Sequence, residues 1–117
     1  MQDLELLKGY AELTKAVVRN SLVEIDINVP KKLEKDSDKS YFTRIKSYFN
    51  RSINLMDTHI EFASNKENKI IHHFCDAFDL DEKRVREAII KHNKKQKAKF
   101  VLRFSSIKNN FKFSYLY

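Results

Sequence analysis

The spacing of apolar residues changes along this chain, and these changes limit its fold more than any other feature. Over residues 1–20 and 41–97, apolar positions recur every three or four residues, as on one face of an amphipathic helix. Over residues 23–29 they alternate with polar ones, as in a half-buried strand, and Pro30 follows. Residues 98–117 also have a strand-like pattern, in which aromatic residues alternate with others: Phe111, Phe113, Tyr115 and Tyr117. The sequence therefore predicts an α+β fold that is mainly helical and ends in a β-hairpin.

The length of 117 residues suits a single domain with a core of modest size. We expect a helix and a strand over residues 1–30, a polar loop over 31–40, a helical part over 41–97 and the hairpin over 98–117. No window approaches 18 uninterrupted apolar residues, so no membrane span is expected.

The sequence also favours a location in the cytoplasm, inside a bacterium or a host cell. The N-terminal run MQDLELLKGY lacks the basic start and the apolar stretch of a signal peptide. The chain has one cysteine, Cys75, which cannot form an internal disulfide. A reducing compartment is the simplest explanation.

Charge is distributed unevenly along the chain. The formal net charge of +7 comes from 23 basic and 16 acidic residues. Residues 91–117 contain 8 of the basic residues and none of the acidic ones, so residues 1–90 keep 15 basic and 16 acidic residues. An AT-rich genome would explain many lysines, but it would not explain why acids are missing from one end. This segregation is typical of a surface that binds a polyanion such as nucleic acid.

Residues 71–90 have the pattern of a helix-turn-helix. In this motif a small residue lies where the two helices cross, an apolar residue lies in the turn, and apolar residues of the second helix face inward. The matching positions are Cys75, Leu80, Val85 and Ala88. The turn usually contains glycine, and here it contains Asp79, which enters the left-handed backbone region more readily than most residues. Asp81 is a good N-cap for the second helix.

The run FCDAFDLDEKRVREAI resembles a form of this motif that is common in small proteins of phages and bacterial mobile elements. The resemblance rests on five residues: Cys75, Leu80, Asp81, Val85 and Arg86. Because a hairpin is expected after the second helix, the order of elements also resembles that of winged-helix proteins, in which the hairpin is the wing. These resemblances imply a regulator that binds duplex DNA by placing the second helix in the major groove.

The expected nucleic-acid-binding residues lie on the second helix and on the wing. The start of the helix offers candidates for contacts with base edges or phosphates: Lys83, Arg84, Arg86 and Glu87. Basic residues farther along are expected to bind the backbone: Lys91, Lys94, Lys95, Lys97, Arg103, Lys108 and Lys112. Three acids, Asp79, Asp81 and Glu82, oppose a phosphate at the start of this helix.

Other interpretations of the motif remain open. It could be a turn between two core helices, or a protein-docking surface that makes the chain an inhibitor of a host complex. The terminal aromatic residues could stack on RNA bases, pack on the core or, if exposed, form a homodimer contact.

Chemistry at this motif has little support in the sequence. We expect no metal or other cofactor, because His72, His73, Cys75 and His92 form no CxxC or HxxxH pair. We expect no enzymatic activity, because the chain has one glycine, hence no phosphate-binding loop, and the pattern buries its thiol.

Overall fold

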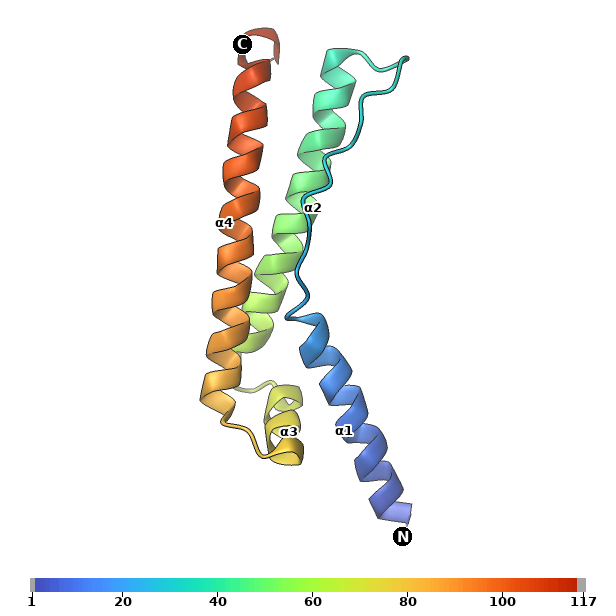
Figure 1. Ribbon diagram of the computed structural model, residues 1–117, viewed down its shortest axis with the longest axis vertical. Coiled ribbons are helices and arrows are strands. Elements are labelled where there is room, and N and C mark those ends of the chain that lie inside the picture. Colours follow the sequence, from blue (N-terminus) through green and yellow to red (C-terminus); the bar gives the residue numbers. More distant parts are fainter. Residues whose placement is uncertain (1, 116–117) are drawn as a thin grey trace.

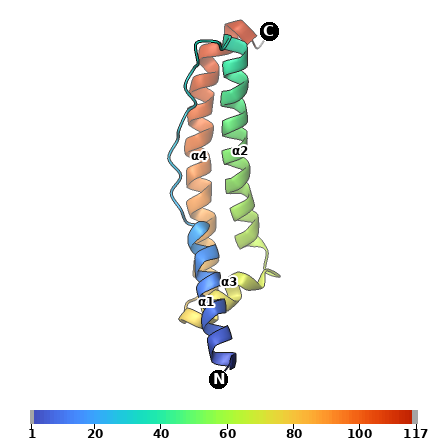
Figure 2. The same ribbon diagram turned by 90° about the vertical axis from the view of Figure 1, so that its right-hand side faces the viewer.

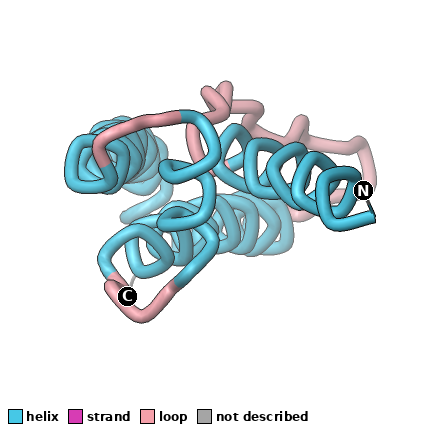
Figure 3. Tube along the Cα trace, turned by 90° about the horizontal axis from the view of Figure 1, so that it is seen from below, coloured by secondary structure: helices cyan, strands magenta, loops and turns pink. Residues whose placement is uncertain are grey.

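The computed structural model describes the backbone of residues 2–115 and the side chains of residues 8–111. Within this range the chain forms helices joined by loops: α1 (Gln2–Asn20), α2 (Asp38–Ser64), α3 (Lys69–Phe78) and α4 (Glu82–Tyr115) (Figure 1). The helical interpretation of residues 1–20 and 41–97 is confirmed. The described residues contain no strand (Figure 3). The predicted α+β fold is therefore wrong, and this part of the protein is all-helical.

The molecule is elongated because α2 and α4 run antiparallel along most of its length (Figures 1 and 2). Helices α1 and α3 lie at the lower end in these views, and the two ends of the chain are far apart. The molecule measures 65 × 27 × 20 Å and has a radius of gyration of 19.3 Å, whereas a compact domain of this length would have one of about 13 Å. This shape leaves one side of α4 against α2 and the opposite side in solvent.

The C-terminal hairpin predicted over residues 98–117 is wrong, because α4 continues as one helix to Tyr115. Phe100, Phe104 and Phe111 recur at helical spacing and pack on α2, where the Phe42 ring lies 6.3 Å from that of Phe104 and 5.3 Å from that of Phe111. No glycine or proline interrupts residues 82–115. There is thus no wing in the described residues. The side chains of Lys112, Phe113 and Tyr115, and all of Tyr117, lie outside the described part.

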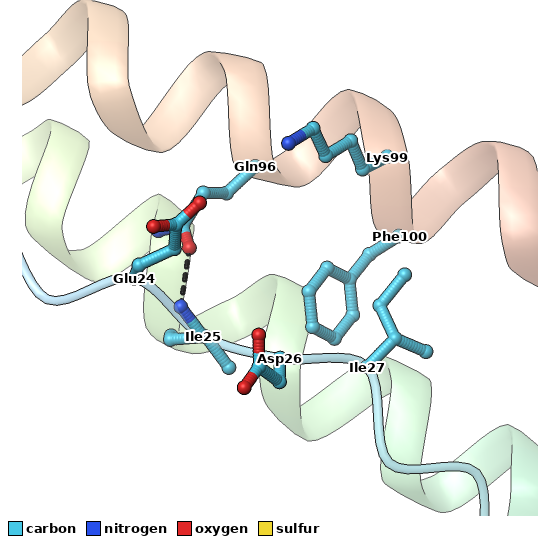
Figure 4. A pocket seen from close by; sticks show the side chains of 7 residues that line it. All are labelled: Glu24, Ile25, Asp26, Ile27, Gln96, Lys99 and Phe100. Carbon is cyan, nitrogen blue, oxygen red and sulfur yellow. Dashed lines mark hydrogen bonds between the residues drawn. The ribbon is translucent and has the colours of Figure 1, made fainter.

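Residues 23–31, which we call the strap, are extended but belong to no sheet. The alternation seen in the sequence matches their burial: Ile25, Ile27 and Val29 pack against the core between α2 and α4, whereas Glu24 and Asn28 are exposed. The predicted strand is wrong, although its one-sided burial is confirmed. The strap lies along both long helices instead of pairing with another strand (Figure 4).

Side chains of the two long helices replace the partner strand. On α4, Gln96 accepts a hydrogen bond from the Ile25 amide (2.6 Å) and donates one to the Val23 carbonyl (3.3 Å). On α2, the Tyr48 hydroxyl accepts from the Asn28 amide (2.7 Å). Two further strap carbonyls accept hydrogen bonds from α2, Pro30 from the Tyr41 hydroxyl and Lys31 from the Arg44 guanidinium. These bonds satisfy backbone groups that a sheet would otherwise pair.

Two apolar clusters stabilise the described part of the fold. The upper cluster joins α2, α4 and the strap around four buried side chains: Ile45, Phe49, Met56 and Phe100. The lower cluster joins all four helices around Val18, Ala63, Ile71, Cys75 and Ile89. Together they fix the rotation of α4 about its own axis, and therefore determine which of its residues face solvent.

Candidate nucleic-acid interface

Helices α3 and α4 meet at a tight turn, as the helix-turn-helix pattern predicts. Asp79 has the left-handed conformation (φ 54°, ψ 53°), and the amides of Asp79 and Leu80 both donate hydrogen bonds to the Cys75 carbonyl. The Asp81 carboxylate accepts a hydrogen bond from the Arg84 amide (3.3 Å), so the expected N-cap of α4 is confirmed. The sequence therefore identified both residues that shape this turn.

The inner side of the motif differs in part from expectation. Cys75 is buried where the helices cross, and burial, together with the nearby negative charge of Glu82, raises the pKa of its thiol. Val85 is half-buried as expected and Ile89 is buried on the same face, but Ala88 is exposed. Leu80 in the turn is also exposed. Two of the apolar positions of the motif, Leu80 and Ala88, therefore face solvent.

Arg86, a predicted contact with DNA, instead faces the protein interior and is only 7% exposed. Its guanidinium donates to the carbonyls of Ala63 (3.1 Å), Asn65 (2.9 Å) and Asn68 (2.9 Å), where α2 ends and the loop to α3 begins. It also pairs with Glu82 at 3.2 Å. A cation at this place complements the negative end of the α2 dipole. Arg86 therefore joins α2, α3 and α4.

Three of the predicted lysines, Lys91, Lys94 and Lys95, lie on the solvent side of α4, and Lys99, which was not predicted as a site residue, lies there with them. Among the described residues, no carboxylate oxygen lies within 4.0 Å of any of their amines. The helical rise places Lys91 and Lys99 about 12 Å apart along the axis. The structure thus groups these four lysines on one rigid helix.

The remaining predicted site residues have different surroundings. Lys83, Arg84 and Glu87 are exposed at the start of α4, so an acid is mixed with two basic residues there. The Lys97 amine pairs with the Asp57 carboxylate of α2 at 2.8 Å, which ties the two long helices together. Two more basic residues, Arg103 and Lys108, are exposed farther along α4, and the side chain of Lys112 lies outside the described range.

One of the acids at the start of α4 is paired. Glu82 contacts the His72 imidazole (2.8 Å) as well as Arg86, and these contacts, with His72 the stronger, lower the pKa of its carboxyl. The Asp79 and Asp81 side chains are exposed, and no basic group pairs with either within the described chain. Negative charge therefore remains at this turn.

Two shallow pockets of the described surface border α4. One, of about 260 Å³, lies where the strap meets α4, and Figure 4 shows Lys99 there with Glu24 and Asp26. These acids offset part of the positive charge of Lys99. The other, of about 520 Å³, lies between the end of α2 and the start of α4, and Ile90 and Ala63 contribute to its wall. In neither pocket do three or more potential metal ligands gather among the described residues.

No helix in the described range combines the length and the apolar character needed to cross a bilayer. Comparison of the chain with protein-family models, curated proteins and solved structures finds no match.

Proposed function

We propose that this protein binds nucleic acid, duplex DNA in particular, through the solvent side of α4, as a non-enzymatic regulator or accessory protein. We call this binding region the basic face and define it as Lys91, Lys94, Lys95 and Lys99. The observation behind the proposal is that these four exposed lysines lie within about 12 Å along the axis of one helix, and that none of them forms an ion pair within the described part of the chain. Such a cluster displaces the counterions condensed on DNA, which is the main source of affinity for a polyanion.

The support beneath the basic face favours binding. On the inner side of α4 the buried Phe100 ring packs on Phe49 of α2, and the Lys97–Asp57 pair adds a polar link between the two helices. The lysine backbone positions are therefore fixed before the ligand arrives, so binding orders only the side chains. The turn between α3 and α4 is the second support, because helix-turn-helix units commonly place their second helix against DNA.

The proposal is tested by measuring fluorescence anisotropy of a labelled duplex at several salt concentrations. If about four phosphates are neutralised, the log–log plot of affinity against salt should have a slope of about −3.6. Reversing Lys91, Lys94 and Lys95 to Glu should lower the affinity by more than about tenfold at low salt.

A matched control distinguishes the effect of losing the basic face from the effect of lowering the net charge of the protein. Reversal of Lys8, Lys35 and Lys39, which are exposed on α1, the loop before α2 and its first turn, changes the net charge equally. This control should reduce affinity much less than the first triple variant, since it leaves the basic face intact. An equal loss in both variants, or binding to anionic vesicles but not to duplex, would overturn the proposal.

Protein docking is the second candidate function, and a feature of α1 favours it. Helix α1 packs mainly on α3, and its outward side is uncharged and exposed at Gly9, Leu13 and Ala16. Leu13 is 60% exposed and, beside Gly9 and Ala16, it gives this side of α1 an apolar centre. Sedimentation of the wild type and of Leu13→Lys tests whether this side joins two copies: a dimer that the variant abolishes would support docking.

A further inference from the structure

The side chains of α4 also indicate which part of the nucleic acid the basic face contacts. We infer that it contacts the sugar–phosphate backbone of duplex DNA and does not read base edges, so that binding is independent of sequence. This inference rests on the proposed function. It follows from which kinds of side chain point outward, from the acids at the start of the helix and from the absence of stacking groups.

Between residues 86 and 99 of α4, the side chains best suited to reading bases point inward. Arginine, asparagine and glutamine recognise guanine or adenine with two parallel hydrogen bonds. In α4, Arg86, Asn93 and Gln96 are 7%, 1% and 5% exposed. Asn93 donates to the Ser21 carbonyl (2.8 Å), and Gln96 holds the strap. All three are therefore committed to internal hydrogen bonds.

The outward side of residues 91–99 has only lysine and alanine. Between Lys91 and Lys99 the exposed positions are lysines together with Ala98. An ammonium group is a flexible point charge that binds phosphate well. It can also donate to guanine O6 and N7, but it lacks the planar fork that fixes the geometry of a base contact. The basic face is therefore better suited to phosphates than to base edges.

The start of α4, which reads bases in helix-turn-helix proteins, is unsuited to approach DNA closely. Arg84 is exposed there, but Asp79, Asp81 and Glu87 are exposed on the same few turns. Their charges repel phosphates and oppose the attraction of the helix N-terminus for anions. The acids thus place the contact on the middle of α4.

Two features favour a duplex over a single strand. Proteins that bind single strands stack bases on aromatic side chains, and residues 82–99 contain no Phe, Tyr or Trp. The distance of about 12 Å from Lys91 to Lys99 is close to the width of the major groove of B-form DNA. Lysines at both ends of the basic face can therefore reach phosphates on both sides of one groove.

The test is a competition experiment at one low salt concentration. Unlabelled competitors are a mixed-sequence duplex, an A·T-only duplex, a G·C-only duplex and a single strand of equal length. We expect the duplexes to compete within about threefold of one another and the single strand to compete more weakly, because its charge density is lower. A duplex preferred by more than about thirtyfold, or a single strand that competes better than duplex, would overturn the inference. A strongly preferred duplex would leave the proposed function intact, and a preferred single strand would leave nucleic-acid binding by α4 intact but not its preference for duplex, whereas no binding to any competitor would refute both the inference and the proposed function.

Two single variants sharpen the test. Glu87→Gln removes an exposed acid that has no pairing partner within the described chain, and it should tighten binding to every duplex by the same factor, about two- to fivefold. Its control is Glu61→Gln, an exposed acid on α2, which should leave affinity unchanged. Arg84→Ala should weaken all duplexes equally. If Arg84→Ala changes their ranking, this arginine reads bases and the inference is wrong.

Discussion

Replacement of Arg86 by alanine should destabilise the fold and leave any DNA sequence preference unchanged. The substitution removes four hydrogen-bond contacts, to the carbonyls of Ala63, Asn65 and Asn68 and to Glu82. Breaking a buried charged network by deleting one partner costs about 3–5 kcal/mol. Since part of this network reaches solvent at Glu82, we expect the lower half of that range, about 3–4 kcal/mol.

The expected shift in melting temperature follows from the size of the chain. An unfolding entropy of about 2.1 cal/mol/K per residue gives about 0.25 kcal/mol/K for 117 residues, so the shift is about 12–16 °C. Circular dichroism at 222 nm during heating and in urea measures it. Arg84→Ala is the matched control, because that exposed side chain has no acidic partner in the described structure, and should cost less than about 0.5 kcal/mol.

The result that would refute this reasoning is an Arg86→Ala protein within about 1 kcal/mol of the wild type. Arg86→Lys gives a further check, because it keeps the charge but loses the fork, and should fall between the other two proteins. At a temperature where Arg86→Ala is still folded, it should bind all duplexes as the wild type does.

Three other perturbations test the packing, the strap and the charged turn. Phe100→Ala should cost about 3–5 kcal/mol, because the ring is 1% exposed in the upper cluster, whereas Val101→Ala on the solvent side should cost less than about 1 kcal/mol in the same urea titration. Gln96→Ala removes two hydrogen bonds to the strap, and hydrogen exchange should show faster exchange of the strap amides with a stability loss of about 1–3 kcal/mol. The His72 contact lowers the pKa of Glu82, so the stability from this carboxylate is present above its ordinary pKa of 4.5 and is lost as the pH falls through the lower folded value. Glu82→Gln should therefore lose less stability than the wild type on acidification, as measured by melting temperature.

The sequence identified most of the helices and the turn between α3 and α4, because these depend on local signals. Asp79 and Asp81 have side chains suited to a left-handed residue and to a helix cap, and both occur where expected. Ser37, which caps α2 by accepting a hydrogen bond from the Ser40 amide, is a residue of the same kind. Backbone conformation at such positions is decided within a few residues of the chain.

The strap shows why an alternating pattern does not establish a sheet. Alternation records that one side of an extended segment is buried, and Ile25 and Ile27 are indeed packed against the core. The alternating pattern does not indicate which groups form hydrogen bonds with the backbone of the segment. Here the partners are the Gln96 amide and the Tyr48 hydroxyl, which are more than 15 residues away in the sequence. Only the assembled fold could reveal them.

The prediction of a hairpin over residues 98–117 was wrong for a different reason, and the same reason affected the prediction of the candidate site. Aromatic residues from Phe100 onward fit both a helical and an alternating spacing, and the buried surface of α2 favours the helix. The charge of Arg86 predicts a surface position, yet this residue lies on the same helical face as the buried Ile89 and Asn93. The helical spacing of the buried face continues from residue 86 to residue 100. It places the polar side chains of Arg86, Asn93 and Gln96 inside the protein, where they donate hydrogen bonds to backbone carbonyls of other segments. Because these groups bind the protein itself, lysine is the charged side chain that remains on the outer side of α4 between residues 91 and 99, and this is why we propose contact with the phosphate backbone and not with base edges.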